Sequence, residues 1–248
     1  MTAVAIQPAR PSLPRLTQVE LRKSVDTRAG FWLLVLVALS LLAVVVLILA
    51  VGDNPRDQDF ESLFAATIGV ASIFLPIIGL LLVTSEWSQR TALTTFTLVP
   101  ERARVVVAKL LACSALAVAA VALCLALSAI GTLISGESWS FELSHLGEGL
   151  LYELFGMLGA LALGLLLMHS ALAIVTYFVL PTVVGIVVEV VPGLNDPAKW
   201  FEPTRSTTPL SEGTINGVEW WHFAVTAAIW VGLPLVLGLL RLARHELK

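Results

Sequence analysis

The residue types that carry most enzyme and metal chemistry are few in this chain, and their spacing matches no common reactive site. Its four histidines show neither HExxH nor HxxxH spacing, so the sequence does not support a metal site. No GxxxxGK(S/T) run occurs, so the chain lacks a P-loop for a nucleotide. Cys113 and Cys124 fall in one predicted helix, about 16 Å apart along its axis, which excludes a disulfide between them. We therefore expect no metal, no bound cofactor and no enzymatic centre in this chain.

Glu86 and Arg90 are the pair whose position comes nearest to suggesting catalysis. Intramembrane proteases of the abortive-infection type combine adjacent glutamates with histidines on other spans. Residue 85 is serine here, and no predicted span carries a matching histidine motif. The four-residue spacing instead favours an ion pair on one helix face, worth about 0.2–0.5 kcal/mol. The protease stays as the weaker alternative.

The composition shows what kind of protein must position these residues. Hydrophobic residues make up 57% of the 248 and charged residues 13%, and the mean hydropathy is +0.90. Soluble domains contain about 45–50% apolar and about 25% charged residues. The net charge of −3 provides no basic surface for nucleic acid. The composition excludes a soluble enzyme or a nucleic-acid-binding module and predicts an integral membrane protein.

The spacing of the charges predicts an all-α, polytopic membrane protein with six transmembrane helices. A spanning helix needs about 20 apolar residues, whereas barrel strands alternate in polarity over about 10 residues. The uncharged run 154–188 is too long for one span, so we place a break at Met168–Ser170. The predicted spans are 30–51, 62–85, 107–135, 147–168, 170–191 and 219–241.

The distribution of Lys and Arg predicts the orientation of these spans. With the N-terminus inside, twelve of the 15 basic residues fall on the cytoplasmic side. The outer side then keeps three, namely Arg56, Lys199 and Arg205. Because cytoplasmic loops carry an excess of Lys and Arg, we place both termini in the cytoplasm.

The N-terminal segment divides into two predicted parts. Residues 1–15 contain three prolines and are expected to form a flexible tail, ahead of one six-span domain at 16–248. Residues 16–28 mix charges, among them Glu20, Lys23 and Arg28, with spaced apolar residues. This pattern favours a helix lying in the membrane interface. The alternative is simple positive charge flanking the first span.

The longest predicted cytoplasmic insertion, residues 85–109, lies between spans two and three. Pro100 suits the first turn of a helix, so we expect a helix, a turn and a second helix. Two explanations of this element stay open, namely docking of a partner protein and anchoring to the inner leaflet. Its candidate contact residues are Glu86, Trp87, Arg90, Pro100, Glu101, Arg102 and Arg104.

Charges within the predicted spans are few, which argues against an ion or proton pathway. The acidic residues of these spans fall near their outer ends, where we expect water to reach them: Glu148, Glu153, Glu189 and Glu219. Prolines are expected to kink spans two, five and six, at Pro76, Pro181 and Pro234.

The largest predicted outer loop, residues 192–218, contains four prolines together with Trp200 and Phe201. It is too apolar for a plain solvated linker. We expect it either to dip against the membrane surface or to cap a cavity.

The order of these features resembles the membrane subunit of the ABC type-2 permease family. In that family the loop after span two often runs as a glutamate, a basic residue, threonines, a proline and an arginine-lysine tail. The matching residues here are Glu20 and Lys23, then Glu86, Arg90, Thr91, Thr94, Pro100, Arg104 and Lys109, then 169–173, Trp200 and Pro203. Family members often carry an arginine at the inner turn, where this chain has Met168 or His169.

The resemblance implies the permease subunit of an ATP-binding-cassette exporter in a bacterial inner membrane. Two permease chains, identical or close paralogues, would form the pathway in the lipid. Two separate ATP-binding subunits would hold ATP and Mg²⁺ and would contact the coupling element, Glu86 to Arg104. The mostly uncharged spans suit an amphipathic or lipid-like cargo. A non-transporting membrane scaffold or assembly protein is the alternative from another class.

Overall fold

The computed structural model describes residues 11–52, 54–89 and 101–244. Within these ranges the chain forms helices and no strand, which confirms the all-α fold. Six helices there are long and apolar enough to cross a membrane, which confirms the predicted number. They are α2 (Arg28–Val51), α3 (Phe60–Ser88), α5 (Arg102–Ser135), α6 (Leu143–Leu167), α7 (Ser170–Val190) and the last helix, made of α10 (Glu219–Ala227), η2 (Ala228–Gly232) and α11 (Leu233–Arg244). The shorter elements are α1 (Leu13–Asp26), η1 (Pro55–Gln58), α8 (Asn195–Ala198) and α9 (Pro203–Ser211).

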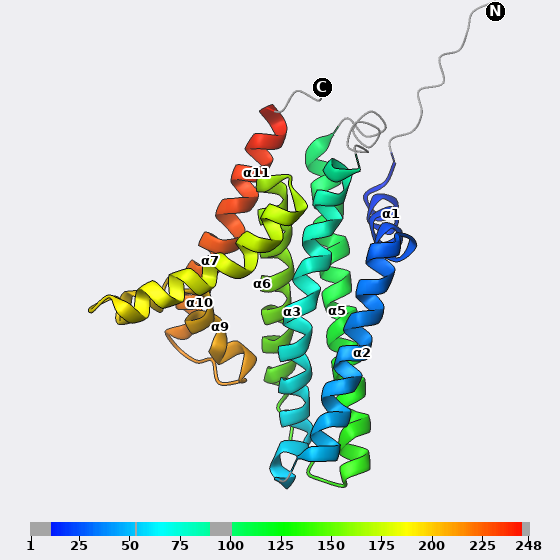
Figure 1. The fold of residues 1–248 in the computed structure, drawn as a ribbon, viewed down its shortest axis with the longest axis vertical. Helices are drawn as coiled ribbons and strands as arrows, with labels where there is room; N and C mark the ends of the chain where they lie inside the picture. The colour runs from blue at the N-terminus through cyan, green and yellow to red at the C-terminus, as the bar shows by residue number, and fades with distance from the viewer. Residues whose placement is uncertain (1–10, 53, 90–100, 245–248) are drawn as a thin grey trace, which may run out of the picture.

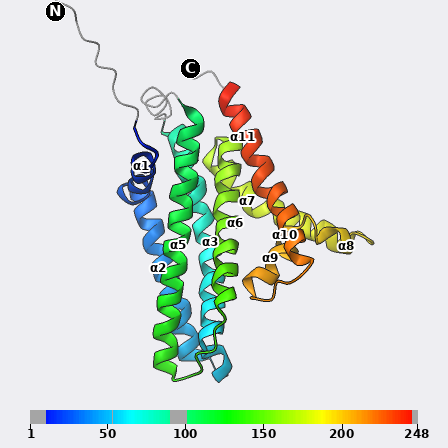
Figure 2. The same cartoon turned by 180° about the vertical axis from the view of Figure 1, so that it is seen from behind.

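Four of the long helices, α2, α3, α5 and α6, form an elongated bundle (Figures 1 and 2). α3 lies at its centre, where it packs against the other three and is the most buried of the six apolar helices. α2 and α7, by contrast, leave most of their apolar side chains exposed. Lipid tails tolerate such exposure, whereas water does not.

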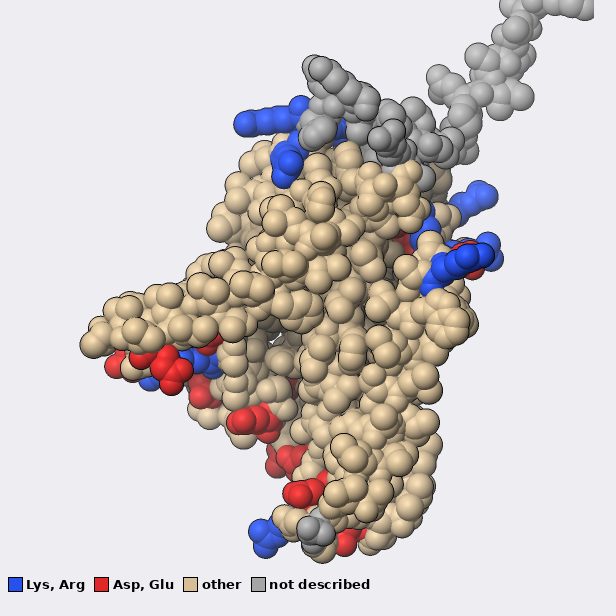
Figure 3. All heavy atoms as spheres, viewed as in Figure 1, with Lys and Arg blue, Asp and Glu red and all other residues tan. Residues whose placement is uncertain are grey.

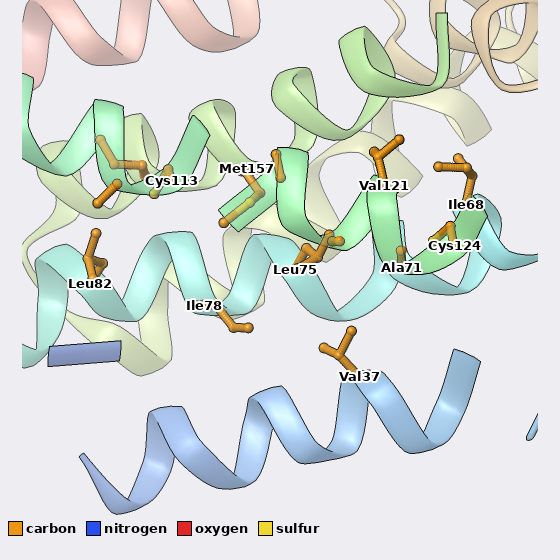
Figure 4. Close-up of a cluster of buried hydrophobic side chains, with 14 of the residues drawn as sticks. Val37, Ile68, Ala71, Leu75, Ile78, Leu82, Cys113, Val121, Cys124 and Met157 are labelled. Carbon is orange, nitrogen blue, oxygen red and sulfur yellow. The ribbon is translucent and has the colours of Figure 1, made fainter. Parts of the chain in front are cut away.

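Apolar side chains from all four bundle helices meet in one core (Figure 4). Leu75 of α3, Val37 of α2 and Met157 of α6 are buried in it. Cys113 and Cys124 of α5 lie in the same core as free thiols.

The backbones of α3 and α6 approach each other closely at Gly79 of α3. A Cβ built on Gly79 would lie 2.8 Å from the backbone carbonyl oxygen of Met157. The backbones of α3 and α6 can come this close because residue 79 has no side chain. Small residues commonly allow such close packing of membrane helices.

The N-terminal helix α1 begins at Leu13, three residues before the predicted start. Pro14 fits its first turn because a helix needs no N–H there. The helix therefore includes residues 13–15, which the prediction had assigned to the tail. Residues 1–10 of that tail lie outside the described ranges.

A change of direction separates α1 from α2. Thr27 has an extended backbone and ends α1, and its hydroxyl accepts a hydrogen bond from the Gly30 N–H in the first turn of α2. This is an ordinary N-cap contact. In Figure 1, α1 is seen nearly end-on while α2 runs along the bundle.

The helices on either side of the predicted coupling element extend beyond the predicted spans. α3 continues through Ser88, so Glu86 and Trp87 belong to its last turn. α5 begins at Arg102, so the basic end of the element belongs to its first turn. Arg90 and Pro100 lie outside the described residues.

The inner turn between α6 and α7 is tight. Met168 ends α6 with a φ of 54°, in the left-handed region that a side chain disfavours. His169 then caps α7, because its Nδ1 accepts a hydrogen bond from the Leu172 N–H at 3.2 Å. The long uncharged run therefore divides at 168–169 without glycine or proline.

α7 leaves the bundle sideways, and the loop that follows it turns back (Figures 1 and 2). α8 and α9 consequently lie at mid-height along the bundle and not at its lower end. α9 packs against α6 and against α10. The predicted outer loop is therefore a folded part of the helical domain.

The three span prolines lie in different surroundings. Pro76 and Pro181 sit inside the continuous helices α3 and α7. Pro234 follows the π-helical turn of η2. Because proline lacks the N–H that would bond to Trp230, the helix needs a local change of register, and a π turn provides one.

Candidate functional site

Two glutamates and two lysines from three helices form a buried ion cluster. We define this ion cluster as Glu20 and Lys23 of α1, Glu86 of α3 and Lys109 of α5. Lys109 Nζ lies 2.6 Å from Glu20 Oε2 and 3.0 Å from Glu86 Oε1. Lys23 Nζ lies 2.7 Å from Glu20 Oε1 and 2.7 Å from Glu86 Oε1. The cluster joins distant parts of the chain, and its formal charges sum to zero.

Helical spacing places the α1 members of the cluster. Glu20, Lys23 and Ser24 recur at intervals of three and four residues, which puts them on one face of the helix. Glu20 and Ser24 are buried on that face, whereas Val19 and Val25 are exposed. These three polar residues of α1 therefore turn into the protein, while part of its apolar surface turns outward.

Lys109 has a complete set of acceptors although only 3% of its side chain is exposed. Besides the two carboxylates, its ammonium donates to the Leu82 carbonyl oxygen at 2.8 Å. A lysine ammonium has three donors, and all three are used here. An unpaired charge at such a site would cost several kcal/mol. Full pairing explains how a lysine is accommodated in the apolar sequence VVVAKLLA.

Lys23 is the cluster member that water reaches, since 37% of its side chain is exposed. Burial acts to lower the pKa of its ammonium. The attraction of Glu20 and then of Glu86, with the hydrogen bonds to both, outweighs that effect, so the pKa of Lys23 is raised above its ordinary value. Lys23 therefore stays charged at neutral pH.

A cavity of about 1,020 Å³ lies beside the ion cluster, between α1, α2, α3 and α5. The Lys23–Glu86 pair, which joins α1 to α3, lines this cavity. Its other lining residues include Leu16, Val19, Thr27, Leu33, Leu81 and Ser85.

The structure places the residues predicted to contact a partner in different environments. The Glu86 carboxylate is only 7% exposed and is turned toward Lys109 and Lys23. In this structure it is not available at the surface, and its position makes it a positioning group between α3 and α1. Trp87 is half-buried against the core, and Arg28 is exposed at the start of α2.

The first turn of α5 holds the remaining predicted contact residues. Glu101 and Arg104 form a loose surface pair with a 3.7 Å separation, and such pairs contribute about 0–1 kcal/mol. Arg102 donates to the backbone carbonyl of Leu242 near the end of α11. Carbonyls at helix ends lack partners within the helix, and basic side chains often satisfy them. Arg102 therefore ties α5 to the C-terminal end of the last helix.

Two carboxyl groups predicted to be accessible to water are buried. Glu148 is 7% exposed and Glu153 is 1% exposed. The prediction was wrong for these two residues because it considered only their distance from the end of the span. Which face of α6 turns toward α3 and α5 depends on the packing of the helices.

A second cavity, of about 550 Å³, lies between α6, α7, α9 and the last helix. α9 contributes Thr204 and Thr207 to its wall, so the folded outer loop caps a cavity, one of the two predicted possibilities. Figure 3 shows the molecule hollowed beneath α7. Other lining residues include Tyr152, Gly156, Tyr177, Pro181 and Trp230.

No model of a known protein family matches this chain, and no curated protein sequence matches it either. Within residues 11–52, 54–89 and 101–244, no three His, Cys, Asp or Glu side chains are gathered as metal ligands would be. A functional proposal must therefore be built on the helices, the ion cluster and the cavities.

Proposed function

We propose that this chain is the permease subunit of an ATP-binding-cassette exporter in a bacterial inner membrane, driven by a separate ATPase. The ion cluster is the observation that carries the proposal. It joins α1, α3 and α5 at the end of the bundle where the chain leaves α3 for the predicted coupling element. The absence of a P-loop from the sequence fits a chain that depends on a partner for energy.

The ion cluster would convert a push on the coupling element into movement of several helices. Glu86 lies in the last turn of α3, directly before that element, and is bonded to α5 through Lys109 and to α1 through Lys23. Breaking these buried contacts singly would leave a charge unpaired, which is costly. A displacement of Glu86 by two ATP-binding subunits would therefore carry α1 and α5 with it.

The distribution of charge supports an orientation with both termini in the cytoplasm. Lys and Arg gather toward the upper end of the molecule in Figure 3, where α1 lies and α11 ends. Asp and Glu gather toward the lower end and beneath α7. The positive-inside rule then places the ion cluster on the cytoplasmic side. There α1 would lie in the membrane interface, with exposed Val19 and Val25 toward lipid.

The 550 Å³ cavity supports an apolar or amphipathic cargo. Its wall is mainly apolar, and its polar groups include Ser72, Tyr152, Tyr177 and the threonines of α9. Ligand sites commonly combine such a wall with a few polar groups that orient the ligand. A second permease chain, either a copy or a close paralogue, would face the exposed apolar sides of α2 and α7 together with lipid.

Cysteine labelling of Ser88 tests the orientation. Ser88 is exposed at the end of α3, next to the coupling element, and both native cysteines are buried. In intact cells, Ser88→Cys should resist a membrane-impermeant maleimide and react only after the membrane is opened. Asp57→Cys, at the opposite end, is the matched control and should react at once. Labelling of Ser88→Cys in intact cells would contradict the proposal.

Co-purification with ATP-binding-cassette subunits from the same genome tests the function itself. We expect a complex of two permease chains and two ATPase chains, whose ATP hydrolysis in nanodiscs responds to lipid-like compounds. Glu86→Gln should reduce that response several-fold, because it weakens the link between α3 and α1. Lys199→Gln alters an exposed pair with Asp196 and should leave the response unchanged.

Two results of this experiment would overturn the proposal. The persistent absence of a nucleotide-binding protein from the purified chain would exclude an ATP-driven subunit. A stable complex whose ATP hydrolysis never responds to any compound would favour the membrane scaffold instead.

A further inference from the structure

Glu153 of α6 is a carboxyl group without a visible partner in the middle of the bundle. It lies ten residues after the start of α6, about 15 Å along the helix axis. Its side chain is 1% exposed. Among the described residues, neither Oε1 nor Oε2 has a hydrogen-bond partner. This arrangement is unlike the ion cluster, where each carboxylate is paired with lysine.

The long helices around Glu153 contain extended stretches without a positively charged residue. α3 carries no charged residue between Glu61 and Glu86, and α5 carries none beyond Lys109. α7 carries none before Glu189. The last helix carries none between Glu219 and Arg241 at its far end. These stretches of the long helices therefore offer no countercharge to Glu153.

The titratable groups that face Glu153 are weak acids. Cys124 of α5 and Tyr177 of α7 lie near enough to interact with it electrostatically, and Tyr152 precedes it on α6. Figure 4 shows Cys124 against Ala71 and Ile68 of α3, in apolar surroundings. Glu202 caps α9, and its carboxylate accepts hydrogen bonds from the backbone N–H groups of Thr204 and Arg205. The Arg205 guanidinium donates to the Asn195 side chain. At the start of the last helix, the His222 ring meets the Trp200 ring edge-on.

We propose that Glu153 is a proton-binding site, loaded when the helices are packed as in this structure and unloaded only when α6 parts from its neighbours. An ionised carboxylate in this place would be desolvated with neither a donor nor a cation, which costs far more than burying the neutral acid. The proton is the ligand that fits, because metal cations require several oxygen ligands. The inference does not depend on an ATP-driven partner.

The 550 Å³ cavity provides the route by which the proton would leave. Tyr152 and Tyr177 line that cavity, and Gly156, one turn beyond Glu153, lines it as well. A Cβ on Gly156 would lie 3.4 Å from the Tyr177 hydroxyl. Residues on either side of Glu153 along α6 therefore line the cavity, whereas Glu153 itself does not. Separation of α6 from α7 would admit water to Glu153 and allow its proton to leave. By linkage, loss of the proton would in turn favour the separated arrangement of the helices.

Infrared difference spectroscopy of the full chain in nanodiscs tests the site. At neutral pH the wild type should show the carbonyl band of a protonated carboxylic acid. Glu153→Gln should lose the intensity of one carboxyl group, whereas Glu189→Gln, which alters an exposed carboxylate, should keep it. An unchanged band in Glu153→Gln would overturn the proposal. Glu153→Leu replaces this variant if the glutamine variant does not fold.

Thiol labelling tests the link to opening. Cys124 and Cys113 are both buried in α5, but only Cys124 lies beside Glu153 at that depth. In single-cysteine backgrounds (Cys113→Ser or Cys124→Ser), raising the pH should increase labelling of Cys124 by a methanethiosulfonate more than labelling of Cys113. Glu153→Gln should abolish the excess. Equal increases at both cysteines would show that release does not open the bundle and would also overturn the proposal.

Discussion

Lys109 of α5 donates a hydrogen bond to Glu20 of α1 across 2.6 Å, although 89 residues separate them. Both side chains are almost wholly buried, and the same ammonium also contacts Glu86. This pair therefore fixes where the N-terminal helix meets the bundle. Buried ion pairs add little stability relative to apolar packing, but losing one partner is costly.

Removal of the Lys109 ammonium should strongly destabilise the protein. Lys109→Met keeps the length of the side chain but leaves Glu20 and Glu86 with fewer donors in a buried site. We expect a loss of about 3–5 kcal/mol in the free energy of unfolding. Tryptophan fluorescence during denaturation in mixed micelles measures it, and the seven tryptophans provide the signal.

The matched control for Lys109 is Lys199→Met. It removes a lysine from an exposed pair with Asp196, and exposed pairs contribute little to stability because water screens them. Equal losses in the two variants would mean that the cluster does not hold α1 in place.

Lys23 should make the stability of the protein depend on pH in the alkaline range. Its pKa is raised above 10.5, so its contribution is complete below pH 10.5 and is lost as the pH rises through the higher folded-state value. Unfolding midpoints across the alkaline range should fall for the wild type. The unfolding midpoint of Lys23→Met should be lower than that of the wild type at neutral pH and should fall less as the pH rises. If the midpoints of the two proteins fell in parallel with pH, Lys23 would not be the group responsible.

Gly79→Ala should separate α3 from α6. The new Cβ would meet the Met157 carbonyl oxygen at 2.8 Å, and the contacting atom belongs to the backbone and cannot rotate away. Overpacking of this kind costs about 1–3 kcal/mol. Gly69→Ala on the same helix is the control, because nothing lies within 4 Å of its Cβ position. That variant should be neutral or slightly stabilised, as helix propensity favours alanine.

Met168→Gly should be tolerated or stabilising at the inner turn. Met168 has a φ of 54°, and a left-handed backbone costs a residue with a side chain about 1–2 kcal/mol. Glycine removes that cost but also loses the methionine side chain, which packs against the core. Leu167→Gly, inside the helix, should destabilise. A larger loss at position 168 than at position 167 would show that Met168 matters for packing more than for the turn.

The sequence by itself determined the class of structure. Long uncharged runs such as 62–85 and 110–136 can satisfy their backbone in lipid only as helices, so helix number and approximate position follow from charge spacing. A break somewhere in the run 154–188 follows from length alone, since one span cannot hold its 35 uncharged residues. These features depend on neighbouring residues and on the thickness of a membrane.

The tertiary structure alone decided which side chains meet. Lys109 stands out in sequence as a lysine within an apolar run, but nothing nearby identifies Glu20 as its partner. The burial of Glu153 likewise depends on which face of α6 packs against α3 and α5. Contacts between distant segments depend on the rotation and spacing of whole helices. Local sequence does not encode those quantities, because any face of an apolar helix is acceptable to lipid.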